Sequence, residues 1–259
     1  METESPFAGT APYYHRFRSP YPPAAIDFLA ATFGLDDAAR VLDLGCGPGT
    51  LAIPLSRTAG EVTALDVDPD MLAEARRLAT EQGRTNIRWL QRPAEQISPA
   101  LGRFRLASLG QSFHWMDRDL VLQHLAEIIE DGGGLALVNP GARRPQESWE
   151  PILEEVVASF LGRRPPHPQR NRERTHQPAL LRSSRFAHFT EHEFASEITR
   201  DIESIIGCAY SLSYAARPRF AERAPDFEAA LTEALLSANP SGVFHEPLET
   251  EVLVAMKAT

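Results

Sequence analysis

Cysteine, lysine and long apolar runs are scarce or missing in this sequence. Its 259 residues include two cysteines, Cys46 and Cys208, which lie far apart. Two distant thiols do not make a disulfide framework, and neither has neighbours at metal-ligand spacing, so we expect a reducing compartment and no metal. No apolar run approaches the ~20 residues of a membrane span, and the N-terminus lacks the basic-then-apolar pattern of a secretion signal. We therefore expect a cytoplasmic protein that does not engage a membrane.

Positive charge is also limited. The chain has 26 Lys and Arg residues against 35 Asp and Glu residues, which gives a net charge of −9. Proteins that bind nucleic acid usually present a basic face, because contacts to phosphate dominate their affinity. The charge balance therefore argues against nucleic acid as a partner and favours a small molecule. It does not decide between a monomer and a homodimer, so both stay open.

Residues 41–50 hold the most informative pattern of the chain. An apolar run leads into three glycines at alternate positions, Gly45, Gly47 and Gly49. A second strand-like run follows and ends on Asp66. A strand, a glycine loop, a helix and a second strand that ends in a carboxylate are typical of a site for an adenosine-containing cofactor. Such a site lies at the carboxyl ends of parallel strands.

The spacing of the glycines indicates which cofactor this is. In a dinucleotide fingerprint two residues separate the second and third glycines, whereas here Pro48 alone separates them. Pro48 has no N–H to donate to a phosphate. Asp43, two residues before the first glycine, would repel a pyrophosphate but suits a cationic ligand such as S-adenosylmethionine, which carries an ammonium and a sulfonium. A nucleotide-dependent oxidoreductase is therefore disfavoured.

Apolar strand patterns alternate with helix patterns between residues 40 and 139. The strands are apolar on both faces, as expected for strands covered by helices on two sides. This alternation predicts an α/β fold with a doubly wound, mostly parallel sheet. The expected strands are 41–44, 62–65, 87–90, 105–109 and 135–138, with residues 131–134 as the turn into the last of them.

The pattern changes after Asn139. We expect helices at 149–161, 202–215 and 219–237, a half-exposed strand at 186–199 and a closing antiparallel strand at 243–256. Residues 163–174 are too rich in proline and arginine for a core element, and they suit either a lid over a substrate or a surface loop. The expected organisation has four parts: an N-terminal segment and helix covering the cofactor (1–39), the cofactor-binding core (40–139), a helical and loop insertion near the substrate (140–185), and C-terminal strands and helices completing the sheet and cap (186–259).

The block from Asp43 to Gly49 resembles the first motif of the class I S-adenosylmethionine-dependent methyltransferases. Segments 66–76, 93–95, 109–117 and 131–137 resemble later motifs of that family, in the same order. Residues 14–22 resemble the Tyr…Arg-Pro-x-Tyr-Pro segment of small-molecule methyltransferases of the trans-aconitate methyltransferase type. Ser19 stands where that pattern has its first proline. The resemblance covers about residues 13–140.

This resemblance implies a Rossmann-like methyltransferase fold with seven strands, an antiparallel last strand and a helical cap. It implies S-adenosylmethionine as the cofactor, with Asp43 near the methionine ammonium and Asp66 on the ribose hydroxyls, each of which is a hydrogen-bond donor. The full set of expected cofactor-binding residues is Tyr14, Arg18, Asp43, Gly45, Gly47, Gly49, Asp66, Val67, Met71, Ala94, Glu95 and Gln111.

His114 is the candidate general base, because imidazole titrates near neutral pH and this residue follows the fourth strand. It could instead only shape the pocket, since methyl transfer to a good nucleophile needs little beyond alignment. The implied activity is methyl transfer to an oxygen, nitrogen or carbon nucleophile of a small molecule. The alternative is a non-catalytic regulatory protein that binds S-adenosylmethionine. A nucleic-acid methyltransferase is disfavoured by the charge and by the lack of an Asn/Asp-Pro-Pro-aromatic motif after strand four.

Overall fold

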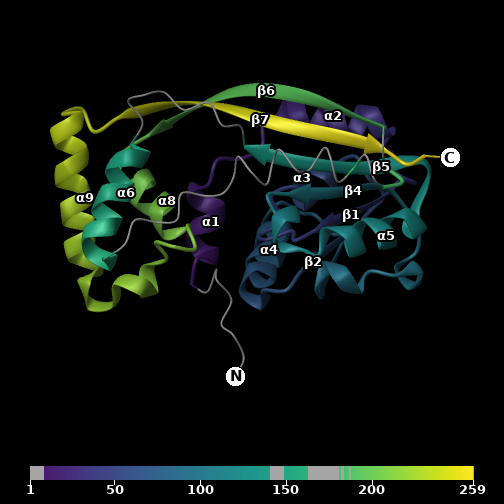
Figure 1. Ribbon diagram of the computed structural model, residues 1–259, viewed down its shortest axis with the longest axis horizontal. Helices are drawn as coiled ribbons and strands as arrows, with labels where there is room; N and C mark the ends of the chain where they lie inside the picture. Colours follow the sequence, from purple (N-terminus) through teal and green to yellow (C-terminus); the bar gives the residue numbers. More distant parts are fainter. Residues whose placement is uncertain (1–8, 141–148, 163–180, 182–183, 187, 259) are drawn as a thin grey trace. The chain divides into compact units, whose positions relative to one another are not determined.

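A computed structural model describes residues 9–140, 149–162, 181, 184–186 and 188–258 (Figure 1). The proline- and arginine-rich stretch 163–174 lies outside the described residues. The chain divides into two compact units. The first comprises Met1–Ser19, Ala142–Arg170 and Ser196–Leu248, and the second comprises Pro20–Gly141, Asn171–Ala195 and Glu249–Thr259. No helix in the described ranges has both the length and the apolar content needed to cross a bilayer.

The strands form one seven-stranded sheet in the order β3-β2-β1-β4-β5-β7-β6. The strands are β1 (Arg40–Leu44), β2 (Glu61–Asp66), β3 (Ile87–Gln91), β4 (Phe104–Gly110), β5 (Ile129–Pro140), β6 (His188–Arg200) and β7 (Phe244–Met256). β1 to β5 pair in parallel, and β7 pairs antiparallel with β5. The predicted doubly wound, mostly parallel sheet with an antiparallel last strand is confirmed. Its strand order reverses between β1 and β4, which is where open α/β sheets bind their ligands.

Alternate residues of β1 face opposite layers of helices. Val41 packs with α2 (Pro23–Phe33) and α3 (Ala52–Leu55), whereas Leu42 packs with α5 (Arg118–Ile128). Both side chains are fully buried. Since successive side chains of a strand point to opposite faces, the next residue, Asp43, lies on the face of α2 and α3. The sheet therefore places one carboxylate inside an apolar layer.

Side-chain caps start the helices that follow the strands. The Asp68 carboxylate accepts hydrogen bonds from the backbone N–H groups of Asp70 (2.9 Å) and Met71 (3.3 Å) at the start of α4 (Pro69–Glu81). The Asp117 carboxylate does the same for α5. These caps satisfy backbone donors that a helix leaves unpaired in its first turn. Helix α4 therefore starts directly after β2.

The predicted turn at 131–134 is wrong. β5 begins earlier, at Ile129, and its pairing with β4 shifts between Phe104 and Leu106, so the glycine-rich residues form a bulge inside the strand. Gly132 has a φ of +77°, a region that favours glycine. Residues 130–133 of β5 stand opposite the single residue Arg105 of β4, and such an excess in one strand of a pair bends it locally.

The first unit is a small helical unit with an aromatic core. It contains α1 (Ala11–Phe17), α6 (Glu150–Leu161), α8 (Ile202–Tyr210) and α9 (Ala224–Ala238). The rings of Phe220 and Phe227 stack with centroids 4.1 Å apart, and Tyr210 packs against both. In α8, a side chain at Gly207 would meet the Phe17 ring, so glycine at this position lets α1 approach closely.

Helix boundaries in this unit differ from those predicted. The helix expected at 202–215 ends at Tyr210. The helix expected at 219–237 is a 3₁₀ segment that kinks at Ala221, followed by α9 from Ala224. Pro225 in the first turn of α9 has no N–H to continue a helix from the preceding segment, which explains the break. Helix α1 was not predicted, because its aromatic and basic residues have no clear apolar periodicity.

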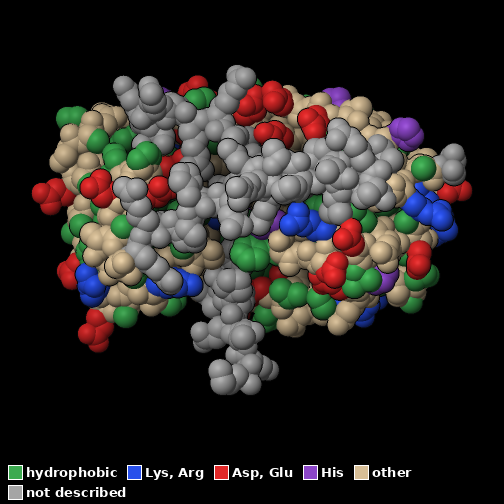
Figure 2. Space-filling model, viewed as in Figure 1, with side chains coloured by type: hydrophobic (Ala, Val, Ile, Leu, Met, Phe, Trp, Pro, Cys, Tyr) green, Lys and Arg blue, Asp and Glu red, His purple; other side chains and the backbone are tan. Residues whose placement is uncertain are grey.

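The edge strand β6 has one exposed acidic row. Glu191, Glu193 and Glu197 are exposed, and acidic side chains gather in this region of the face shown in Figure 2. On the other side, the half-buried Phe194 packs on Phe28 of α2 with ring centroids 5.4 Å apart. The predicted half-exposed strand is confirmed. A row of like charges on an edge strand opposes pairing with a second copy of the same edge.

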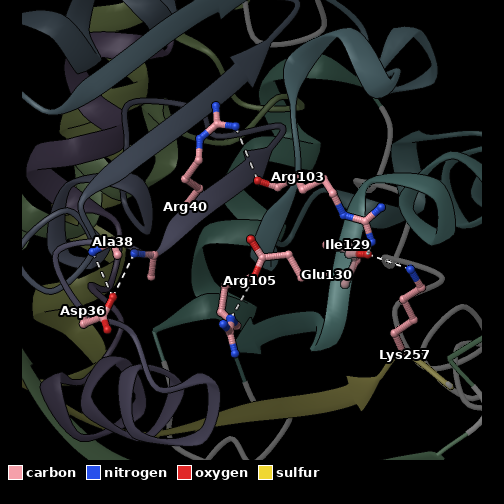
Figure 3. A network of polar contacts seen from close by, with 9 residues as sticks. Asp36, Ala38, Arg40, Arg103, Arg105, Ile129, Glu130 and Lys257 are labelled. Carbon is pink, nitrogen blue, oxygen red and sulfur yellow. Dashed lines mark hydrogen bonds and ion pairs between the residues drawn. The ribbon is translucent and has the colours of Figure 1, made fainter.

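A polar network joins Lys257 to the amino-terminal ends of β4 and β5 (Figure 3). The Lys257 ammonium donates to the Ile129 carbonyl (2.7 Å) and lies 3.6 Å from the Asp131 carboxylate, with its side chain 9% exposed. The Arg103 guanidinium donates to the same carbonyl (3.1 Å), and Arg105 pairs with Glu130 (3.0 Å). This network lies at the end of the sheet opposite the glycine loop.

We expect Lys257→Met to destabilise the protein by about 1–3 kcal/mol, because it removes a charged donor from a nearly buried carbonyl. Urea unfolding followed by circular dichroism measures this. Arg77→Gln is the control, since Arg77 is half exposed and its ion pairs with described residues are to glutamates of its own helix. Equal midpoints for the two variants would contradict a stabilising role of Lys257.

Candidate active site

The three glycines of the loop after β1 have different surroundings. All have positive φ values: +63° at Gly45, +53° at Gly47 and +85° at Gly49. A Cβ atom on Gly45 would lie 2.5 Å from the Ser112 Cβ atom, and one on Gly49 would lie 2.9 Å from the Trp89 ring. A Cβ atom on Gly47 would meet nothing within 4 Å. Gly45 and Gly49 therefore allow close packing, whereas Gly47 forms the open side of the loop.

Asp43 is a buried carboxylate with one unpartnered oxygen. Asp43 is 1% exposed, and its Oδ1 accepts a hydrogen bond from the Ser108 hydroxyl (2.8 Å). Its Oδ2 has no hydrogen-bond partner in the described part of the chain. Burial raises the pKa of Asp43 to about 7, and the hydrogen bond from Ser108 and the nearby backbone N–H of Ala52 partly oppose this. Unpartnered buried carboxylate oxygens are costly, so this one is suited to a ligand that supplies a donor.

Ser108 was not predicted as a site residue. It is fully buried on β4 and pairs in register with Asp43. A hydroxyl directly opposite the acid in a mostly apolar strand is a signal that the sequence contains. The signal needs the strand register to be interpreted, and the register is known only from the structure.

Asp66 ends β2 and holds the glycine loop. Its Oδ2 accepts from the Gly47 N–H (2.7 Å) and its Oδ1 accepts from the Asp68 N–H (2.9 Å). Burial raises the pKa of Asp66, and these two hydrogen bonds oppose the rise. A carboxylate oxygen has two acceptor positions, so both oxygens can still accept from ribose hydroxyls. The next residue, Val67, is 60% exposed and free to contact a flat apolar ligand surface.

The other expected residues of the second unit follow β2, β3 and β4 in the chain. Met71 and Ala94 are buried core residues, 4% and 6% exposed. The Glu95 carboxylate accepts from the Asp117 N–H (2.8 Å) and so joins a short 3₁₀ turn to the start of α5. Gln111 follows β4 with a φ of +53°, an uncommon value for a residue other than glycine and one that often marks functional sites.

His114 lies in the 3₁₀ turn Phe113–Trp115 after β4 and is exposed. Its ring centroid is 5.1 Å from that of Trp115, which is 59% exposed.

Tyr21 was not predicted as a site residue, but its hydroxyl reaches the same strand ends. The hydroxyl oxygen lies 3.5 Å from the Val138 carbonyl oxygen. A Cβ atom on Gly110 would lie 2.7 Å from that hydroxyl oxygen.

The structure brings Asp43, the glycine loop and Asp66 together at the carboxyl ends of β1 and β2. Tyr14 and Arg18 belong to the first unit and are not placed relative to this group. These groups define a cofactor site of the Rossmann-like class: a glycine loop, a buried acid with an unpartnered oxygen, and an acid at the end of the second strand.

Comparisons with known proteins identify the family. A model of the methyltransferase domain matches residues 41–133. The aklanonic acid methyltransferase of a Streptomyces species (strain C5) is 30% identical over 66% of this chain and 74% of that protein. The malonyl-acyl-carrier-protein O-methyltransferase of Enterobacter lignolyticus is 35% identical over 61% of this chain and 62% of that protein. The chain belongs to the class I S-adenosylmethionine-dependent methyltransferase family.

Other similarities support the fold. An uncharacterised methyltransferase of Mycobacterium bovis is 32% identical, and the match spans 58% of each of the two chains. An S-adenosylmethionine-dependent methyltransferase from Thiobacillus denitrificans, solved with S-adenosylhomocysteine, has a TM-score of 0.56 at 20% identity, over 99% of this chain and 100% of that one. A precorrin 8w decarboxylase from Methanobacterium thermoautotrophicum also has a TM-score of 0.56, at 11% identity, over 94% of this chain and 95% of that one.

The residues present fit the cofactor of this family. The unpartnered Oδ2 of Asp43 suits an ammonium, the side of the loop at Gly47 is open, and Val67 is exposed beside the carboxylate of Asp66. S-adenosylmethionine is therefore the cofactor that the fold, the family and these groups have in common.

We expect the affinity for S-adenosylhomocysteine to fall as the pH is lowered from 8 to 6. The pKa of Asp43 is about 7 in the unliganded protein, so its carboxylate is increasingly protonated over this range and loses its attraction for an ammonium. Titration calorimetry at pH 6, 7 and 8 measures the effect. Asp43→Asn should bind weakly at every pH. A wild-type affinity that does not change with pH would contradict the assignment of Asp43.

The same carboxylate should destabilise the unliganded protein above neutral pH. The folded state releases the Asp43 proton near pH 7 and the unfolded state near pH 3.8, so between these values the folded state holds more protons and loses stability as the pH rises. We expect Asp43→Asn to stabilise the protein at pH 8 by on the order of a few kcal/mol, and by less at pH 5. Thermal unfolding at both pH values checks the sign, and a variant less stable than the wild type at pH 8 would refute it.

Proposed function

We propose that this chain transfers a methyl group from S-adenosylmethionine to an oxygen, nitrogen or carbon nucleophile of a small molecule. The observation that carries the proposal is the buried Asp43, with one oxygen unpartnered among the described residues, beside a glycine loop in a member of a methyltransferase family. The bound cofactor supplies a methyl group on a positively charged sulfur. The protein binds it, excludes water and aligns the acceptor for in-line attack.

The cofactor contacts follow from these positions. Asp43 binds the methionine ammonium, Asp66 binds the ribose hydroxyls, and Val67 packs on the adenine. The loop glycines, Gly45, Gly47 and Gly49, let the backbone approach the ligand closely. Met71, Ala94, Glu95 and Gln111 form the wall of the site in the second unit, and Tyr14 and Arg18 contribute from the N-terminal segment.

The acceptor is a small molecule, and carboxylic acids are the first class to test. The two related enzymes with named acceptors act on a malonyl group and on aklanonic acid, and both names describe a carboxylic acid. The net charge of −9 disfavours nucleic acid. The fold alone does not decide the reaction, since a decarboxylase has it too. Monomer and homodimer stay open.

His114 acts as a general base where the acceptor carries a proton that must leave. It is exposed at the end of β4, so its imidazole can reach a ligand at the strand ends. A phenol or an ammonium needs such a base, whereas a carboxylate is already ionised at neutral pH and does not. The need for His114 therefore depends on the acceptor.

The test is the release of S-adenosylhomocysteine, measured by mass spectrometry, from S-adenosylmethionine and a panel of carboxylic acids, phenols and amines. A catalytic protein releases it with some acceptor. The alternative, a non-catalytic regulatory protein, binds the cofactor but releases nothing with any of them.

For a phenol or amine acceptor, we expect His114→Ala to lower the rate by about 10²- to 10⁴-fold while cofactor affinity stays unchanged. For a carboxylic acid, the same variant should keep most of the rate. His188→Gln is the control, because this histidine is exposed on β6. If His114→Gln methylates a phenol or amine at nearly the wild-type rate, His114 only shapes the pocket.

A further inference from the structure

Ser108 places a buried hydroxyl in the central strand β4, next to β1. The residue is fully buried, and its Oγ lies 2.8 Å from Oδ1 of Asp43 and 3.5 Å from the Leu42 carbonyl oxygen. A serine hydroxyl has one hydrogen, so it donates to the nearer and charged acceptor. Ser108 and Asp43 are partners in the pairing of β1 with β4, so the sheet itself fixes this contact.

The hydrogen bond from Ser108 determines which oxygen of Asp43 is left for a ligand. Oδ1 is occupied by the hydroxyl, and Oδ2 has no hydrogen-bond partner among the described residues. A carboxylate that turned freely about its Cβ–Cγ bond would have to be ordered when a ligand binds, and an acceptor that is already held in place avoids this cost. The contact with Ser108 therefore presents Oδ2 as a preorganised acceptor.

The other surroundings of Asp43 oppose its ionisation. Burial raises the pKa of Asp43, and the negative charge of Asp66 at the end of β2 raises it further. The Cys46 thiol of the glycine loop adds no positive charge, since burial raises its own pKa and keeps it neutral. The Ser108 hydroxyl and the nearby backbone N–H of Ala52 lower the pKa of Asp43. Of these two groups, the hydroxyl is the one that a substitution can remove.

A second serine holds the backbone next to Asp43. Ser112 follows β4, and its hydroxyl donates to the Leu44 carbonyl (2.6 Å). A Cβ atom on Gly45 would lie 2.5 Å from the Ser112 Cβ atom, so the glycine lets this segment pack closely on the end of β1. Asp43 is thus held twice from the same direction, at its side chain by Ser108 and at the following residue by Ser112.

We propose that Ser108 is a positioning residue of the cofactor site. It holds the Asp43 carboxylate ionised and in one orientation, so that Oδ2 receives the ammonium of the methionine part of S-adenosylmethionine. Ser108 does not contact the cofactor and acts through Asp43. The proposal rests on the proposed function, in which Asp43 binds this ammonium. Selectivity for a ligand that carries an ammonium is then a property of the pair formed by Asp43 and Ser108.

Calorimetry with two probes at two pH values tests this role. S-adenosylhomocysteine carries the ammonium, and 5′-methylthioadenosine lacks it. Ser108→Ala should weaken S-adenosylhomocysteine binding by about 10-fold at pH 6.5 and much less at pH 8.5, because losing the donor raises the pKa of Asp43 and a higher pH restores the carboxylate. Binding of 5′-methylthioadenosine should be unchanged at both pH values. Each affinity is compared with that of the wild type at the same pH, so the ionisation of the probe itself cancels.

Ser56→Ala is the matched control. Ser56 is 3% exposed in the same unit, and its hydroxyl donates to the Ile53 carbonyl (2.7 Å), so the same group is removed from a buried position away from Asp43. This variant should bind both probes like the wild type. Ser108→Cys keeps the shape of the side chain and a weak donor. It should show an intermediate loss with the same pH dependence, and it serves as the test if Ser108→Ala does not fold.

A double-mutant cycle separates action through Asp43 from general damage. In an Asp43→Asn background, Ser108→Ala should cause no further loss of S-adenosylhomocysteine affinity, because there is no carboxylate to ionise. A further loss as large as that in the wild-type background overturns the proposal. So do equal weakening of both probes, an unchanged affinity for S-adenosylhomocysteine, or a loss that is the same at pH 6.5 and pH 8.5.

The unliganded protein gives a test that does not depend on the cofactor. If the wild type binds neither probe, the proposed function is contradicted, and the link between Ser108 and Asp43 is tested by carbon-13 NMR of the Asp43 carboxyl group. Its titration midpoint should lie at a higher pH in Ser108→Ala than in the wild type and in Ser56→Ala. The same midpoint in all three proteins overturns the role of Ser108.

Discussion

The cofactor site depends on the two hydrogen bonds that the Asp66 carboxylate accepts from Gly47 and Asp68. One bond joins the end of β2 to the loop after β1, and the other joins it to the residue that caps α4. Three separate pieces of backbone are thus held by one side chain. The loop can remain open at Gly47 because this carboxylate, and not packing above the loop, fixes its shape.

Much of the second unit was predictable from the sequence, because its structural determinants are local. Apolar runs produced the buried strands, Asp68 and Asp117 capped the helices, and the glycine loop indicated the cofactor. What the sequence could not show depended on register. The role of Ser108 could be interpreted only once the pairing of β4 with β1 placed it opposite Asp43. The bulge around Gly132 could be identified only once the pairing of β5 with β4 was known.

The first unit was harder to predict because aromatic packing holds it together. Helix α1 has no regular apolar stripe. It is held by the packing of the Phe17 ring against Gly207 and by the hydrogen bond from Arg200 to the Phe17 carbonyl. Contacts between residues nearly 200 positions apart leave no local pattern. The assignment of site residues was correspondingly easier for the acids beside the glycine loop than for Tyr14 and Arg18.

The nearly enclosed side chain of Lys257 has a practical consequence. Lys257 is the only lysine among the 259 residues, and its ammonium is nearly enclosed. An acylating reagent can therefore modify a side-chain amine of this protein only when the C-terminal end detaches from Ile129. The rate of acylation at this one position would measure how often the last strand opens, without any label having to be introduced.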